Sequence, residues 1–160
     1  MNYTKAISKL LDEVKKAYIE DQESKGIRAS GKSAKSIKKH VKPTEGTLTG
    51  AKYFFQQRHG RKPGRFPPID SIIDWIRAKR ITPGLYQPIA KVGRKIPNPV
   101  QLTERSLAFI IANKIAKQGT DIYSGKRKGL DPGEKVQTLV AAFSREVAKD
   151  LRKEIITSLK

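Results

Sequence analysis

The stretch KSIKKHVKPTEGTLTGAKYFFQ, residues 35–56, decides the fold class, because it has a strand pattern in a chain whose other patterns are helical. Ile37 and Val41 stand among lysines, residues 43–46 (Pro-Thr-Glu-Gly) have the composition of a turn, and residues 47–55 are rich in Thr, Tyr and Phe. Such residues suit a pleated, half-buried surface. We therefore predict two short strands that form a hairpin.

Helical patterns lie on both sides of this hairpin, with apolar residues recurring every three or four positions. Pro67-Pro68 suits the start of a short helix, and Thr103 and Asp131 suit the N-caps of two longer ones. Gly26 and Gly119 are stop signals. The predicted helices cover residues 3–24, about 68–79, 103–118 and about 131–158. Three longer helices, one short helix and a small antiparallel hairpin predict an α+β fold with long Pro- and Gly-rich loops.

The length of 160 residues suits a single domain. We expect three parts within it: an N-terminal helix at 1–25, a basic hairpin, short helix and loops at 26–100, and a helical part at 101–160. Prolines and glycines exclude a regular helix from residue 81 to residue 99 and predict a long extended loop.

Each of the last two helices is expected to bury one apolar face. In the first of them this face consists of Leu107, Ile110, Ile111 and Ile115. In the second it consists of Val136, Val140, Phe143, Val147, Leu151 and Ile155. Phe54 and Phe66 are also expected in the core, because the chain has few other aromatic residues.

Positive charge is concentrated in the middle of the chain. The chain has 34 Lys and Arg against 15 Asp and Glu, and +14 of the net charge of +19 lies in residues 26–95. Because one-signed stretches repel themselves, such a surface indicates an acidic partner, either nucleic acid or protein. The candidate residues for an interface or polyanion contact are Arg58, His59, Arg61, Lys62, Arg65, Lys91, Arg94 and Lys95.

Composition also excludes several classes of site. The absence of cysteine excludes a disulfide framework, a thiolate metal site and a cysteine nucleophile. No apolar run approaches the ~18 residues of a membrane span, and the first residues lack the apolar stretch of a signal peptide. We expect a soluble protein of a cytosol-like compartment, without a membrane partner.

Residues 26–33, Gly-Ile-Arg-Ala-Ser-Gly-Lys-Ser, satisfy the phosphate-loop pattern. A nucleotide site of that type needs a buried strand before the loop, whereas residues 20–25 are the polar tail of a helix. No later apolar run ending in Asp supplies a second magnesium ligand. We interpret this segment as a helix–strand connection and predict no cofactor.

Other catalytic patterns are equally weak. His40 and His59 are isolated from each other and from any carboxylate cluster, which makes a poor metal site. Serine catalysis needs a base and an orienting acid, and neither histidine has an obvious partner. Asp70 and Asp74 share one face of the short helix, as expected of a solvated face. We predict no catalytic residue, no metal and no enzyme activity.

Three stretches follow one another in a recognisable order. The first is Ser-Gly-Lys-Ser-Ala-Lys-Ser-Ile at 30–37, before Tyr53-Phe54-Phe55 and Gly60. The second is Gly-Arg-Phe-Pro-Pro-Ile at 64–69, before Ile72, Trp75-Ile76, Lys79 and Ile81. The third is Leu-Ala-Phe-Ile-Ile at 107–111, before Lys114-Ile115 and Gly119-Thr120. Over about 90 residues, this order resembles that of the head–tail joining or tail-completion (neck) proteins of tailed bacteriophages.

The resemblance implies a structural virion protein without enzyme activity, assembled in the host cytoplasm into a ring of identical subunits in the virion neck. Its partners would be further copies of itself, the portal or connector and the tail proteins. It also implies structural roles for Gly31, Ser36, Gly60, Pro67, Pro68, Trp75, Ile76 and Gly119. The sequence departs from the family pattern at Arg58-His59-Gly60, where an acidic residue is common, and in its long 81–99 segment.

Closed rings use head-to-tail contacts, so the loops 56–66 and 81–99 are the expected interfaces. Non-specific contact with genomic DNA in the channel is open as well, because the charge pattern does not distinguish DNA from acidic protein. The alternative function is a non-specific nucleic-acid-binding protein that uses the basic residues 26–65.

Overall fold

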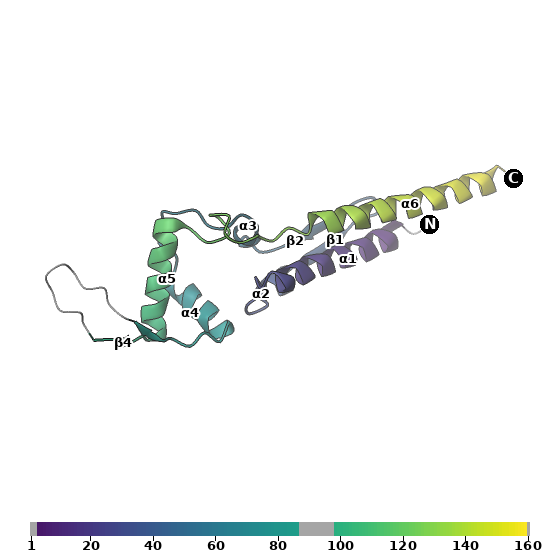
Figure 1. Cartoon of the computed structure of the whole chain (residues 1–160). Helices are drawn as coiled ribbons and strands as arrows, with labels where there is room; N and C mark the ends of the chain where they lie inside the picture. The colour runs from purple at the N-terminus through teal and green to yellow at the C-terminus, as the bar shows by residue number, and fades with distance from the viewer. Residues whose placement is uncertain (1–2, 87–97, 160) are drawn as a thin grey trace. The chain divides into compact units, whose positions relative to one another are not determined.

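The structure is a computed structural model that describes residues 3–86 and 98–159. Its fold is α+β, with six helices and two small antiparallel sheets in the described ranges (Figure 1). In chain order the elements are α1 (Tyr3–Ser24), α2 (Lys32–Ser36), β1 (Lys38–Val41), β2 (Gly46–Thr49), α3 (Phe54–His59), α4 (Ile69–Ala78), β3 (Leu85–Tyr86), β4 (Val100–Gln101), α5 (Glu104–Gln118) and α6 (Gly133–Ser158).

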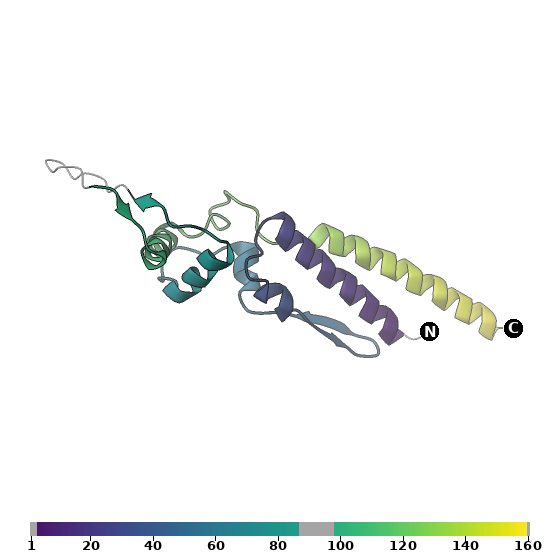
Figure 2. The ribbon, with the colours of Figure 1, turned by 90° about the horizontal axis from the view of Figure 1, so that it is seen from below.

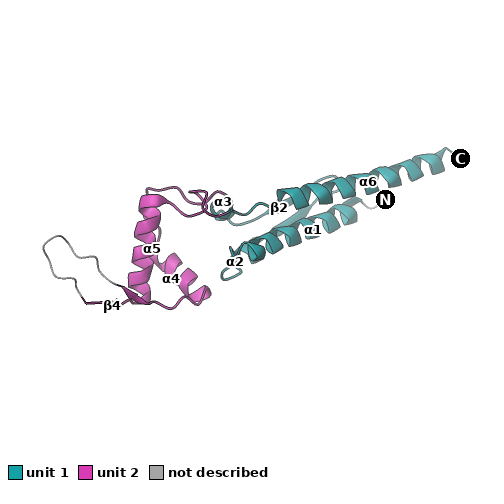
Figure 3. Ribbon diagram, viewed as in Figure 1, with its two compact units in different colours: residues 1–58, 128–160 teal, residues 59–127 magenta. Residues whose placement is uncertain are grey.

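The chain forms two compact units (Figure 3). Unit 1 contains residues 1–58 and 128–160, and unit 2 contains residues 59–127. A compact unit is not by itself a separate domain, so the single domain stays a prediction.

In unit 1, α1 packs against both strands of the hairpin and against α6. Figure 2 shows the hairpin and α6 along different sides of α1. Leu11, Val14 and Ala17 are the buried apolar residues of α1. The predicted stop is confirmed: Gly26 adopts a φ of 59°, and the N–H of Ile27 donates to the carbonyl oxygen of Gln22 at 2.8 Å.

The predicted hairpin is confirmed. β1 and β2 pair antiparallel, from Lys38 opposite Thr49 to Val41 opposite Gly46. The expected strand at Tyr53–Phe55 is wrong, because Phe54–His59 forms the short helix α3. The ring of Phe54 packs edge-on against Tyr18, with ring centroids 6.5 Å apart, and this tertiary contact overrides the strand preference of the aromatic residues.

α6 begins one residue later than predicted, at Gly133. The N-cap is Pro132, without a side-chain capping bond, so the expected cap at Asp131 is wrong. The Asp131 carboxylate instead accepts from the N–H of Gly133 at 3.3 Å. α6 also has no buried residue, so its predicted apolar face is only partly covered, and Val140, Leu151 and Ile155 are exposed.

Unit 2 is built on α4 packed against α5. The buried cluster consists of Ile72, Ile76, Ala108 and Ala112. Small alanines allow the two helices to approach closely, whereas Ile110, expected in the core, is 39% exposed. The predicted cap of α5 is confirmed, since Oγ1 of Thr103 accepts from the N–H of Ser106 at 3.1 Å.

The segment predicted as a long loop, residues 81–99, contains the short strand β3 in its described part and is followed directly by β4. Leu85 pairs with Gln101 and Tyr86 with Val100 in an antiparallel ladder. No helix is present in residues 81–86 or 98–101, as the prolines and glycines predict. None of the helices in the described ranges is both long and apolar enough to cross a bilayer.

Candidate functional site

The phosphate-loop pattern lies in unit 1 without the surroundings that nucleotide binding needs. The element before it is α1, not a strand, and α2 after it has only five residues. The hydroxyl of Ser33, which would hold magnesium in a phosphate loop, is buried and donates to Oε1 of Gln22 at 3.1 Å. The interpretation of this segment as a connection is therefore supported by its hydrogen bonding.

This hydrogen bond belongs to a small polar network that the sequence did not indicate. Gln22 is fully buried, although it lies in the polar tail of α1. Its Nε2 donates to Oε1 of Gln57 at 3.2 Å, and Nε2 of Gln57 donates to Oγ of Ser33 at 3.4 Å. The network joins α1, α2 and α3, and three residues so far apart in sequence carry no local signal of it.

In unit 2, the segment from residue 60 to residue 66 is bonded to the C-terminal end of α5. The N–H of Arg61 donates to Oγ1 of Thr120, and the N–H of Thr120 donates to the carbonyl oxygen of Arg61, both at 2.9 Å. Further along, the N–H of Gly64 donates to the carbonyl oxygen of Ala116 at 2.8 Å. These bonds fix the backbone that presents the predicted basic residues.

The structure brings together three of the eight predicted contact residues: Arg61, Lys62 and Arg65. Lys62 and Arg65 are exposed, and Nη2 of Arg61 donates to the carbonyl oxygen of Arg65 at 2.8 Å. Arg58 and His59 lie at the end of α3, where Arg58 is 3.8 Å from the Asp131 carboxylate. Lys91, Arg94 and Lys95 lie outside the described residues.

Phe66 follows these basic residues in the chain and forms an aromatic pair with Phe109 of α5. The rings of Phe66 and Phe109 lie 5.5 Å apart, at 46° to each other. Phe66 is 42% exposed and Phe109 56%, so the expectation that Phe66 is a core residue is wrong. Its place is taken by the isoleucines and alanines between α4 and α5. We call Arg61, Lys62, Arg65, Phe66 and Phe109 the basic–aromatic surface.

All three family-like glycines have a positive φ, and at two of them, Gly60 and Gly119, a side chain would also collide with a neighbouring backbone atom. Gly60 and Gly119 have φ angles of 72° and 76°. A Cβ on Gly60 would lie 2.3 Å from the backbone nitrogen of Tyr123, and one on Gly119 would lie 2.7 Å from the carbonyl oxygen of Arg61. Both glycines therefore hold residues 60–64 close to residues 119–123.

The other family-like residues have varied surroundings. Gly31 adopts a φ of 73° before α2, and the hydroxyl of Ser36 donates to the carbonyl oxygen of Ser33 at 2.7 Å. Pro68 is the N-cap of α4, after the buried Pro67. Ile76 is fully buried, whereas Trp75 is 41% exposed.

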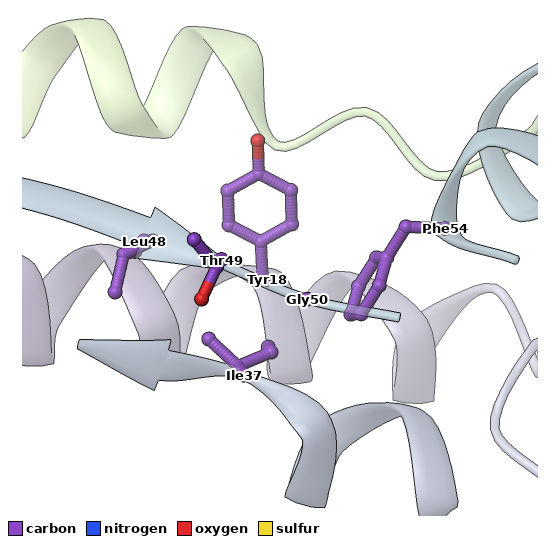
Figure 4. A pocket seen from close by; sticks show the side chains of 6 residues that line it. All are labelled: Tyr18, Ile37, Leu48, Thr49, Gly50 and Phe54. Carbon is purple, nitrogen blue, oxygen red and sulfur yellow. The ribbon is translucent and has the colours of Figure 1, made fainter. Parts of the chain in front are cut away.

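Unit 1 also has a pocket of about 220 Å³ (Figure 4). Figure 4 shows its lining residues, which come from α1, the C-cap of α2, the end of β2 with the residue after it, and the start of α3: Tyr18, Ile37, Leu48, Thr49, Gly50 and Phe54. Apart from two hydroxyl groups, this lining is apolar, which suits an apolar side chain better than a charged ligand.

Within the part of the chain that the structure describes, two groups have shifted pKa values, and both belong to ion pairs between helices. The hydrogen bond from Lys135 lowers the pKa of Glu20, and this ion pair joins α1 to α6. The hydrogen bond to Glu104 raises the pKa of Arg77. Nε of Arg77 donates to Oε2 of Glu104 at 2.9 Å, and this pair joins α4 to α5.

Across residues 3–86 and 98–159, no three His, Cys, Asp or Glu side chains are grouped to hold a metal ion. No family model matches the chain, and neither a curated protein nor a solved structure matches it.

Proposed function

We propose that this chain is a structural virion protein that forms part of a ring of identical subunits in the neck of a tailed bacteriophage, joining the portal to the tail. The observation that carries this proposal is the distribution of apolar residues. Within the described ranges, ten hydrophobic residues are buried, whereas sixteen large hydrophobic residues are exposed. Exposed apolar surface on this scale is typical of a subunit that is completed by its neighbours.

The proposed protein acts by shape and by complementary interfaces, without chemistry. The order of the three family-like stretches supports the location in the neck. The Ser33 hydroxyl donates a hydrogen bond to Gln22, which supports the interpretation that the phosphate-loop pattern is not catalytic.

The basic–aromatic surface supplies the contact with an acidic neighbour. Its exposed Lys62 and Arg65 lie on a backbone fixed to α5, so they are presented without further ordering of the chain. A ring through which DNA passes needs weak, sequence-independent contacts, and lysine and arginine side chains provide these through phosphate groups.

The alternative, nucleic-acid binding through residues 26–65, is less well supported. Four basic side chains of this region form ion pairs with acidic residues of unit 1: Arg28 with Glu23, Lys39 with Asp12, Lys42 with Glu45, and Arg58 with Asp131. Each pair reduces the charge that this region offers to phosphate groups, since part of its field is already neutralised.

The oligomeric mass tests the proposal. Sedimentation and native mass spectrometry of the full chain, alone and with purified portal and tail components, should give closed multiples of 17.9 kDa that enter particles. A duplex-DNA titration over a range of salt concentrations runs in parallel. A monomer that never enters particles, and that binds duplex DNA tightly with a steep loss in salt, would instead establish the alternative.

A further inference from the structure

α6 has two apolar faces, of which α1 covers one. The side chains of Val136, Leu139, Phe143 and Val147 are half-buried, and α6 packs against α1. A second row of side chains lies on another face of α6, at the positions that share a face when successive residues turn by about 100°. We call this row the open stripe; it consists of Gln137, Val140, Ser144, Ala148, Leu151, Ile155 and Ser158.

The open stripe has no charged residue along its length, in a chain of which 31% is charged. Every member is exposed, including Leu151 at 42% and Ile155 at 56%. The hydroxyls of Ser144 and Ser158 donate to carbonyl oxygens of their own helix at 2.9 and 2.8 Å. The stripe is therefore uncharged, with four apolar side chains and with its hydroxyl donors already satisfied, which suits contact with another protein surface.

Opposite charges flank the two edges of the open stripe in the C-terminal half of α6. At about 100° per residue, Arg145 and Arg152 lie along one edge. Glu154 lies along the other edge, with Asp150 behind it on the side of α1. One edge is thus basic and the other acidic.

This arrangement of charge is complementary to itself in one orientation. When two copies of a helix face each other in parallel, the left edge of one lies opposite the right edge of the other, so basic meets acidic. When they face each other antiparallel, like edges meet, so Arg lies opposite Arg. Edge charges of this kind set the orientation of packed helices.

We propose that the open stripe is the contact between copies of this chain, with α6 of one copy parallel to α6 of the next and the basic edge of one stripe against the acidic edge of its neighbour, so that the contact is head-to-tail. The inference rests on the proposed ring, because all subunits of a cyclic ring point the same way along its axis, so equivalent helices that run along this axis are parallel. It goes beyond the ring in naming the helix, the face and the orientation.

Cysteine cross-linking tests the orientation, since the chain contains no cysteine of its own. Gln137→Cys and Ser158→Cys place a thiol at opposite ends of the stripe, about 32 Å apart at 1.5 Å per residue. Both sites are exposed, so neither change disturbs packing. In the parallel arrangement, each variant of the full chain forms a disulfide with its own copies under mild oxidation.

Two results would overturn the inference and separate it from the ring itself. Disulfides that form only when the two variants are mixed would mean an antiparallel pair. Rings of normal mass in which neither variant forms disulfides would mean that another surface joins the subunits, and the proposed function would stand. A chain that stays monomeric at high concentration, alone and with virion components, would contradict both.

A substitution in the stripe gives an independent readout. Leu151→Glu places a charge in the middle of the contact and should weaken self-association at least about tenfold. Ala142→Glu is the matched control, because Ala142 is exposed on the same helix about 160° from the stripe centre. Equal self-association of the two variants, with unchanged helix content, would contradict the proposal.

Discussion

The hydroxyl of Ser33 donates a hydrogen bond of 3.1 Å to Oε1 of Gln22, and both side chains are buried in unit 1. With Gln57 as the third member, this bond joins α1, α2 and α3. A buried amide that loses a partner keeps its desolvation cost without compensation. The segment that matches the phosphate-loop pattern therefore has a structural role, because it holds α1, α2 and α3 together.

Replacing Ser33 with alanine should destabilise unit 1. Ser33→Ala removes the donor to Gln22 and the acceptor for Gln57, which costs about 1–3 kcal/mol. Chemical unfolding followed by circular dichroism measures this loss. Ser30→Ala is the control, because Ser30 is exposed and accepts only a 3.5 Å bond from Lys32. Equal stability of the two variants would show that the network contributes nothing.

The lysine of the phosphate-loop pattern should be dispensable for nucleotide chemistry. Lys32 is exposed at the start of α2, where no preceding strand positions a phosphate. We expect no ATP hydrolysis by the full chain and no difference between it and Lys32→Ala in a phosphate-release assay. Hydrolysis by the wild type that Lys32→Ala abolishes would refute our interpretation of residues 26–33.

The longer elements could be predicted from sequence because each carries its own periodic signal. The four helices and the hairpin have apolar spacing or a turn of their own. α3 was missed because six residues rich in Phe favour a strand locally, and only the contact with Tyr18 decides otherwise. α2 was missed because five residues give too short a pattern.

Only part of the candidate site could be predicted from the sequence. Charge counting found Lys62 and Arg65, which are exposed as expected. It could not show that Phe66 leaves the core to pair with Phe109, because that depends on how closely Ala108 and Ala112 let α4 approach. A contact between side chains of two separate elements leaves no pattern in the sequence of either element.

Gly60 should not tolerate a side chain. Gly60→Ala forces a Cβ to within 2.3 Å of the Tyr123 backbone nitrogen at a φ of 72°, which costs about 2 kcal/mol or more. Thermal unfolding measures the loss. Gly84→Ala is the control in the same unit, since a Cβ there meets nothing within 4 Å. A Gly60→Ala variant as stable as Gly84→Ala would contradict the described packing of residues 60 and 123.

Pairing of α1 with α6 should weaken in acid. The pKa of Glu20 is lowered from its ordinary value of 4.5 by the hydrogen bond from Lys135. The folded state therefore binds this proton less well than the unfolded state, so the contribution to stability is complete above that value and is lost as the pH falls through the lowered pKa. The stability difference between wild type and Glu20→Gln should shrink between about pH 5 and pH 3.

The measurement is denaturant unfolding over that pH range, and the effect should be small because the pair is exposed to solvent. Glu13→Gln, on the exposed face of the same helix, is the control for the loss of one negative charge from α1. A stability difference between Glu20→Gln and the wild type that stays constant over this pH range would mean that the ion pair does not stabilise the fold.

The basic–aromatic surface should contact duplex DNA weakly and without sequence preference. Replacing Lys62 and Arg65 with glutamine removes two phosphate contacts, which reduces the slope of log affinity against log salt by about two. Both side chains are exposed, so stability should not change. The control is Lys149→Gln with Lys153→Gln, which removes the same charge from α6. A slope that falls equally in both variants would mean that net charge alone drives binding. A slope that changes in neither would assign the surface to an acidic protein neighbour, since phosphate groups would then play no part in what Lys62 and Arg65 contact.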